Sequence, residues 1–171
     1  SYTDAFFEAM SGLTTTGSTV MLGLDFTPPG ILLWRALLQW LGGIGIIAMA
    51  IAILPLLQVG GMQLFRMESS DTSDKVMPRT TQIVTYISVL YLALTGLCAL
   101  LYWFGGMSGF DAITHAMTTI ATGGFSNHDA SIGFFKSPVI DATATVFMVI
   151  GGMPFVLYLQ AIRGAPARLI R

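Results

Sequence analysis

The sequence predicts an all-α membrane protein built from tandem repeats, each made of a helix, a re-entrant loop and a second helix. Three observations support this class: long stretches without charge, an internal repeat, and two short loops rich in hydroxyl groups and glycine. The chain is 54% hydrophobic and only 10% charged. Soluble domains carry about 25% charged residues, so the composition favours a lipid environment.

Three stretches are long enough to cross a bilayer. Asp, Glu, Lys and Arg are absent from residues 36–65, 80–110 and 142–162. A spanning helix needs about 20 apolar residues. We therefore expect transmembrane helices at roughly 31–57, 81–104 and 139–162. A buried helical hairpin of a soluble protein is the alternative, but so small a domain could not enclose three such stretches.

The basic residues predict the orientation of these spans, because loops rich in Lys and Arg stay in the cytoplasm. Six of them lie between the first two spans or after the third: Arg66, Lys75, Arg79, Arg163, Arg168 and Arg171. The opposite side carries six acids: Asp4, Glu8, Asp25, Asp111, Asp129 and Asp141. Residues 61–79 and the C-terminus should thus be cytoplasmic, and the acidic outer face should attract cations.

A shift of 107 residues aligns two segments of the chain. The segment "DAFFEAMSGLTTTGST" at 4–19 lies over "DAITHAMTTIATGGFS" at 111–126, with six identities: Asp4/Asp111, Ala5/Ala112, Ala9/Ala116, Met10/Met117, Thr15/Thr122 and Gly17/Gly124. Each copy is followed by an outer connection and a long apolar helix with a glycine cluster, "LGGIG" or "IGGMP". Two repeats of the same unit follow from this pattern.

Each repeat should begin with a short helix, at 4–13 and 111–120, capped by Asp4 and Asp111. Ten residues span roughly 15 Å, half of a bilayer core. The loop that follows must return to the side it came from, enclosed by protein or lining a watery path. Such a loop can turn its backbone carbonyls toward a monovalent cation in place of water. The loops contain no carboxylate, which disfavours calcium and magnesium.

Four motifs resemble a known family: "SGLTTTGST", "QWLGGIGIIAMAIAILP", "GGMQLFR" and "TIATGGFSNHDASIGFF". They are similar to the Trk/Ktr/HKT superfamily of potassium transporters, and most closely to the bacterial TrkH type, over essentially the whole chain. In that family four repeats surround one potassium-channel-like pore. The resemblance implies a fragment with three transmembrane helices and two re-entrant pore helices. Residues 1–60 would complete the first repeat, 61–79 would be a cytoplasmic connector, and 80–171 would form the second repeat.

The resemblance also implies the site, the cargo and the partners. A potassium selectivity filter would include Thr15, Thr16, Gly17 and Ser18 from one loop and Thr122, Gly123, Gly124 and Phe125 from the other. Potassium would be the only bound metal, with no covalently bound cofactor, no transition-metal site and no nucleic acid. The expected surroundings are the bilayer of the bacterial inner membrane, a second full-length subunit in a homodimer, and a TrkA-like cytoplasmic nucleotide-binding regulator.

Several other residues carry expectations of their own. Glu8 and His115, at equivalent positions, should hydrogen-bond to neighbours and hold the short helices. Arg35 should reach the headgroups or pair with an outer acid such as Asp25. His128 and Asp129 are expected in a solvated outer loop. A proline inside a helix removes a hydrogen bond, so Gly151, Gly152 and Pro154 should kink the inner pore. An interfacial belt should hold Trp34, Trp40, Tyr102 and Trp103.

We expect potassium uptake across the cytoplasmic membrane, by passive or ion-coupled movement, and no enzymatic activity, because the sequence has no nucleophile and base at motif spacing, no Walker loop and no redox motif. Two alternatives stay open. One is an alternating-access, cation-coupled solute carrier, which would use inverted repeats. The other is a non-transporting structural subunit packed through its glycines.

Overall fold

The computed structural model describes residues 1–57, 76–155 and 158, and no strand occurs in that part of the chain. Its elements are α1 (Tyr2–Leu13), η1 (Leu24–Phe26), α2 (Pro29–Leu57), α4 (Val76–Phe104), α5 (Gly109–Ile120), η2 (Ser131–Phe135) and α6 (Pro138–Gly152). Most of the predicted connector 61–79 and the basic residues Arg66, Lys75, Arg163, Arg168 and Arg171 lie outside the described residues.

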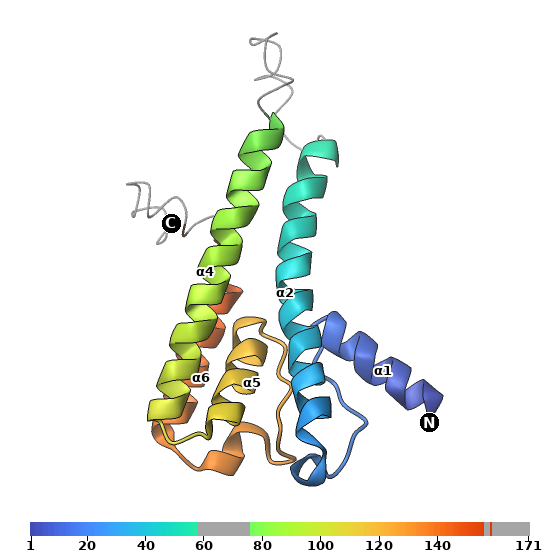
Figure 1. Cartoon of the computed structure of the whole chain (residues 1–171), viewed down its shortest axis with the longest axis vertical. Helices are drawn as coiled ribbons and strands as arrows, with labels where there is room; N and C mark the ends of the chain where they lie inside the picture. The colour runs from blue at the N-terminus through green and yellow to red at the C-terminus, as the bar shows by residue number, and fades with distance from the viewer. Residues whose placement is uncertain (58–75, 156–157, 159–171) are drawn as a thin grey trace.

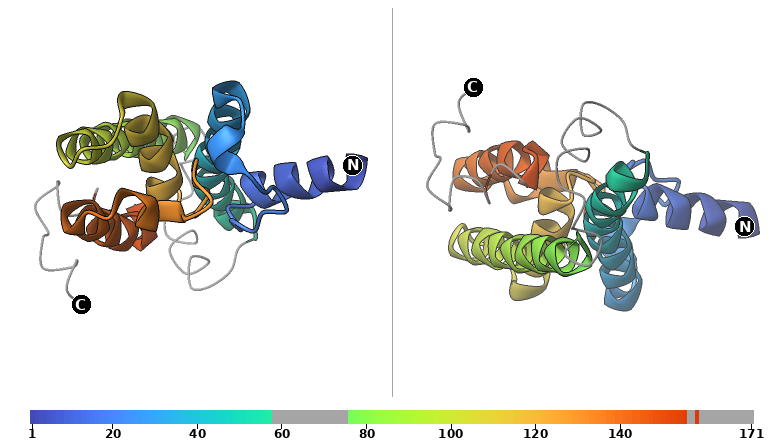
Figure 2. Two further views of the ribbon diagram at one scale, coloured as in Figure 1. Left: turned by 90° about the horizontal axis from the view of Figure 1, so that it is seen from below. Right: turned by 90° about the horizontal axis from the view of Figure 1, so that it is seen from above.

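Two long helices, α2 and α4, frame the molecule, and α6 runs beside α4 (Figures 1 and 2). The short helix α5 packs against all three of these helices. Among the described helices, α1 has extensive contacts with α2 only. Buried side chains of α4, α5 and α6 form the core, including Tyr91, Cys98, Ala116 and Phe147. The helical class predicted from the sequence is confirmed for the described residues.

The long helices begin close to where the sequence placed them. Pro29 starts α2, as a proline in the first turn has no hydrogen bond to lose. Helix α4 begins at Val76, five residues before the expected start at 81, so the end of the predicted connector is helical. Pro78 in the first turn is compatible with that start. Among the described residues, Val84–Phe104 alone is long and apolar enough to cross a membrane, and Pro138–Gly152 is a shorter apolar helix.

The short helices end where predicted, at Leu13 and Ile120, but their caps are not the predicted aspartates. Ser1 and Ser108 are the N-caps, and their hydroxyl groups accept hydrogen bonds from the backbone N–H of Asp4 and Asp111. The prediction was wrong by three residues, because serine and an acid three positions later form one capping unit. The aspartates still lie in the first turn, where negative charge is favourable.

The third long helix is interrupted rather than kinked. Helix α6 ends at Gly152, Met153 has an extended backbone (φ −77°, ψ 143°), and Phe155 is helical again. The residue before a proline is disfavoured in the helical region, so Pro154 explains why the break falls at Met153. The predicted region is therefore irregular, although the break is complete where the sequence suggested only a bend. The predicted span to 162 extends beyond the described residues.

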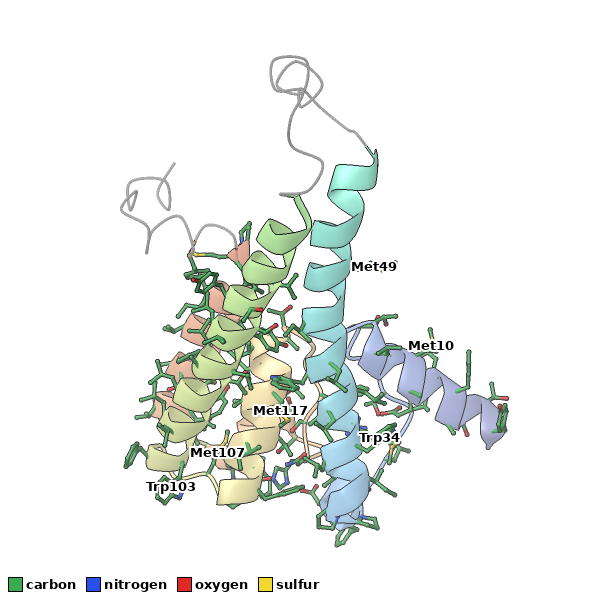
Figure 3. The ribbon with its side chains drawn as sticks, turned by 45° about the horizontal axis from the view of Figure 1, so that its top comes forward. Met10, Trp34, Met49, Trp103, Met107 and Met117 are labelled. Atoms are coloured by element: carbon green, nitrogen blue, oxygen red, sulfur yellow. The ribbon has the colours of Figure 1, made fainter. Side chains whose placement is uncertain are left out.

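The predicted aromatic belt is wrong for two of its four residues. Trp34 near the start of α2 and Trp103 near the end of α4 are exposed and lie toward the same end of the molecule (Figure 3). Tyr102 is fully buried and its hydroxyl group bonds to Thr119, 2.8 Å away. Trp40 is partly buried and donates its indole N–H to Thr95 of α4. The polar ends of these two side chains thus find partners inside the protein.

Candidate functional site

The two predicted filter loops have the same backbone geometry. Adding 107 to the bounds of α1 (2 and 13) gives the bounds of α5 (109 and 120). The same shift relates the positive φ angles of Thr15 (55°) and Gly17 (79°) to those of Thr122 (51°) and Gly124 (83°). A positive φ is uncommon for threonine and signals a constrained segment. The repeat found in the sequence is therefore present in the conformation of the chain.

Each short helix ends against a glycine of the long helix that follows it. A Cβ atom on Gly42 would lie 2.0 Å from the carbonyl oxygen of Leu13, the last residue of α1. One on Gly151 would lie 2.6 Å from the oxygen of Ile120, the last residue of α5. Counted from the helix starts at 29 and 138, both glycines are the fourteenth residue. These two glycines therefore provide room for the ends of the short helices.

Matching hydrogen bonds turn each chain out of its short helix. The backbone N–H of Thr16 donates to the oxygen of Ser11, and that of Gly123 donates to the oxygen of Thr118, again 107 residues on. In the first loop the Ser11 hydroxyl group also donates to the oxygen of Ser18, over 2.6 Å. Both loops then return toward the end at which their short helices began (Figure 1).

The two loops lie directly against one another. A Cβ atom on Gly17 would fall 1.9 Å from the carbonyl oxygen of Gly123, so no other residue fits there without a shift. This contact joins residues that are 106 positions apart in the chain. Position 17 thus requires glycine for two reasons: the positive φ of the residue and the close approach of the Gly123 backbone. The loops are on the same side of the molecule, as a shared ion path requires.

Gln39 of α2 fastens the second loop, although it belongs to the first repeat. Its side chain is fully buried. Its Nε2 donates to the oxygen of Gly123 over 2.9 Å, and its Oε1 accepts from the N–H of Phe125 over 3.1 Å. The oxygen of Gly123, one of the predicted filter carbonyls, is therefore already engaged by a protein donor. Nothing in the sequence pattern singled out this glutamine.

A buried ion pair joins the first loop to the second. Glu8 of α1 and Arg35 of α2 lie 2.7 Å apart, with side chains only 8% and 3% exposed. Glu8 also accepts from the hydroxyl group of Thr19 and from the N–H of Val20. Arg35 donates to the oxygen of Ser126 in the second loop and to the hydroxyl group of Thr19 in the first.

The guanidinium group of Arg35 also lies 4.1 Å from the centre of the Phe125 ring, a cation–π contact. The expected pairing of Arg35 with an outer acid is therefore confirmed, but the acid is Glu8 and not Asp25, and the alternative position at the headgroups is wrong. A buried guanidinium needs several acceptors, and Glu8 and the two loops supply them.

His115 takes the place of Glu8 in the second repeat. Its Nδ1 lies 2.9 Å from the carbonyl oxygen of Asp111, which can only accept, so Nδ1 carries the proton. Its Nε2 then accepts from the hydroxyl group of Ser126, the equivalent of Thr19. In both repeats the side chain at this position holds the hydroxyl group at the end of the loop. The expected supporting role of Glu8 and His115 agrees with these contacts.

The outer turns are also joined. The carboxylate of Asp129 accepts from the N–H of Leu24 over 3.1 Å, and His128 donates its Nδ1–H to Asp25. That hydrogen bond from His128 is the main cause that holds the pKa of Asp25 below its ordinary value. His128 is only 15% exposed and stacks on Phe134. The expectation of a solvated loop is thus wrong for His128, because Phe134 and Phe135 of η2 pack against its ring and Asp25 of the first repeat binds it.

A cavity of about 160 Å³ lies next to the loops, at the C-terminal ends of α1 and α5. Thr15 and Thr122, the two threonines with positive φ, line it together with Tyr91, Gly151 and Phe155. The cavity brings the start of both loops next to the break in α6. Within the described residues no group of three or more His, Cys, Asp or Glu side chains could hold a metal ion.

The structure brings together several of the predicted site residues. Gly17 and Gly123 touch, and Thr15 and Thr122 share the cavity. Gly151 lies there too, whereas Gly152 has open space around it. Asp4 and Asp111 lie at the far ends of the short helices. Gln39 was missed, because one uncharged polar residue in a long apolar helix gives no periodic signal.

Comparisons with known proteins show the family of the chain. The family model described as TrkH, "Cation transport protein", matches residues 1–171. A Trk system potassium uptake protein, TrkI of Halomonas elongata, is 52% identical over all of this chain and 35% of its own length. TrkH of Escherichia coli K12 is 51% identical over 95% of this chain and 34% of its own length.

A solved structure is also similar. The crystal structure of the potassium transporter TrkH from Vibrio parahaemolyticus has a TM-score of 0.82 and 46% identity, covering 96% of this chain and 32% of its own. The chain spans about a third of the length of the relatives it matches. Fold and sequence together place this helical chain among proteins described as cation transport proteins. The chain belongs to the TrkH family.

Proposed function

We propose that this chain supplies two neighbouring sides of a potassium pathway in a TrkH-type uptake protein of the bacterial inner membrane. The observation that carries the proposal is the matched pair of loops, with positive φ at Thr15, Gly17, Thr122 and Gly124. When residues with positive φ alternate with residues of negative φ, successive carbonyl groups point to the same side of the chain. A row of such oxygens can replace the hydration shell of a monovalent cation.

The surroundings of the loops favour a cation. The C-terminal ends of α1 and α5, which carry partial negative charge, lead directly into the loops. Within the loops the side chains are hydroxyl groups, hydrogen and one phenyl ring, so nothing in 14–18 or 122–126 would bind a dehydrated ion too tightly. The nearby charges of Glu8 and Arg35 compensate each other. A path of neutral oxygens suits potassium better than a divalent ion.

A bilayer is the proposed surroundings of the long helices. In the apolar stretch of α4, within Val84–Phe104, only 22% of the residues are buried. The core helix of a soluble protein would be mostly buried. Large apolar side chains such as Leu92, Leu100, Val146 and Val149 are exposed. We propose three spans in this chain, formed by α2, α4 and the α6 region, with α1 and α5 entering from the outer side.

The two alternatives explain less. An alternating-access carrier would use inverted repeats, but α1 and α5 are related by a constant shift and lead into loops on the same side. A structural subunit would not need two threonines with positive φ in equivalent loops. Relatives named as potassium uptake proteins favour the potassium pathway. Homodimer formation and a TrkA-like cytoplasmic regulator are part of the same proposal.

Potassium uptake by the full-length protein that contains this chain, in cells lacking other uptake systems, tests the proposal. The wild type should restore growth at low potassium. Gly17→Ser and Gly124→Ser should lower uptake or change its ion selectivity while the protein still reaches the membrane, because both glycines have positive φ. Wild-type behaviour of both variants would refute the assignment of the loops.

A further inference from the structure

Gln39 makes a paired contact with the second loop that no other described side chain makes. Its amide bonds to the oxygen of Gly123 and to the N–H of Phe125, the main-chain groups on either side of Gly124. Gly124 is the residue whose φ of 83° turns the chain in this loop. One buried side chain therefore holds both neighbours of the loop's turning point.

The contact extends to the first loop through the Gly123 carbonyl group. The three atoms nearest to a Cβ placed on Gly123 all belong to Gln39, at 2.3–2.8 Å. The oxygen of Gly123 in turn occupies the space in which a Cβ of Gly17 would lie. Gln39, Gly123 and Gly17 thus form a continuous series of contacts from α2 through the second loop to the first.

This arrangement is not repeated in the second unit. Position 39 is the eleventh residue of α2, and the eleventh residue of α6 is Met148, which is 48% exposed and cannot donate a hydrogen bond. A residue required only for packing the repeat would be apolar in both copies. The amide at position 39 is therefore specific to the junction between these two loops.

We propose that Gln39 is a positioning residue that sets the ion discrimination of the filter by fixing the orientation of the peptide groups from Gly123 to Phe125. The inference rests on the proposed potassium pathway. Discrimination between monovalent cations depends on the number and field strength of the carbonyl groups around the ion. Without Gln39 the peptide group that follows Gly123 can rotate, which changes the direction of the neighbouring carbonyl groups of Thr122 and Gly124. The loop would then offer sodium and potassium a different set of ligands.

Two single substitutions in the full-length protein test this role. Gln39→Met keeps the volume and removes both hydrogen bonds, whereas Gln39→Glu keeps the acceptor for Phe125 and removes the donor to Gly123. Both should lower the ratio of potassium to sodium uptake roughly fivefold or more, the effect of losing one hydrogen bond of ordinary strength. The protein should still be found in the membrane.

Thr95→Val is the matched control. It removes a hydroxyl group of similar burial that accepts from Trp40, the residue next to Gln39, and so deletes a bond between α2 and α4 without touching either loop. Thr95→Val should lower the amount of protein at most and leave the uptake ratio unchanged. A change in the ratio as large as that of Gln39→Met would show a general effect of loosening α2 and would overturn the proposal.

A second pair of variants keeps the test decisive if Gln39→Met does not assemble. Gly123 has no positive φ, so the main obstacle to alanine there is the side chain of Gln39. Gly123→Ala alone should abolish uptake, and adding Gln39→Ala should restore membrane assembly and transport with reduced discrimination. Failure of Gln39→Ala to rescue Gly123→Ala would contradict the proposed contact.

The wild-type measurement separates the two proposals. If the wild type takes up no potassium, the proposed function fails. If it does, and Gln39→Met and Gln39→Glu keep the wild-type ratio of potassium to sodium at normal membrane levels, only the role of Gln39 fails.

Discussion

The buried pair of Glu8 and Arg35 allows a quantitative test of how the two loops are held. Both side chains are more than nine-tenths buried, and their charged atoms lie 2.7 Å apart. Removing one partner of a buried ion pair typically costs about 3–5 kcal/mol, because the remaining charge is left without compensation. Glu8→Gln retains an acceptor for Arg35, so we expect a loss at the lower end, about 3 kcal/mol.

Arg35→Met should cost at least as much as Glu8→Gln. The substitution leaves the Glu8 carboxylate with only Thr19 and Val20, and it deprives the oxygen of Ser126 of its donor. The contact with the Phe125 ring, about 0.5–2 kcal/mol in comparable cases, is lost as well. The expected loss is about 4–5 kcal/mol.

The double variant Glu8→Gln/Arg35→Met contains no buried charge at this place. Its loss of unfolding free energy should therefore be smaller than the sum of the losses of the two single variants, by more than about 1 kcal/mol. The assay is the unfolding equilibrium of the purified full-length protein in mixed detergent micelles. Asp25→Asn, at the partly exposed outer contact, serves as a control and should stay close to the wild type. Losses that add to within about 0.5 kcal/mol would refute the account of a coupled pair.

Two further predictions concern the supports of the short helices, each with a control from the same chain. Gly42→Ala and Gly151→Ala should destabilise the protein by about 1–3 kcal/mol, because the added methyl groups overpack against Leu13 and Ile120. Gly45→Ala and Gly152→Ala are the controls and should be tolerated, because both glycines have open space around them. Equal thermal stability of all four variants would contradict the close approach. Ser108→Ala should cost about 0.5–2 kcal/mol because it removes an N-cap, and Ser137→Ala, whose side chain makes no cap bond, should stay within about 0.5 kcal/mol in the same unfolding measurement.

The sequence predicted those parts of the fold that depend on local pattern. Hydropathy located α2, the body of α4 and the start of α6, and self-alignment located both short helices and both loops. These features follow from the length of the uncharged stretches and from the repeat of residue types at a fixed spacing. The end points Leu13 and Ile120 were correct for this reason.

The sequence could not predict the polar contacts between repeats. For Arg35 the headgroups and an outer acid such as Asp25 were both left open, and Glu8 was not singled out, because the distance from Arg35 to Glu8 depends on how α1 folds back onto α2. The same is true of Gln39 and Gly123, which are 84 positions apart in the chain, and of His128 and Asp25. The positive φ of Thr15 and Thr122 was also missed, since glycine, not threonine, is the usual signal of that conformation.

The most direct test is to locate bound ions in a structure of the full-length protein determined in rubidium, which scatters anomalously and stands in for potassium. The account predicts ions between the loops, coordinated by main-chain oxygens of Thr15, Thr16 and Gly17 and of Thr122 and Gly124. Ions bound only at side chains elsewhere, or loops that are pushed apart by other segments with no ion between them, would contradict it.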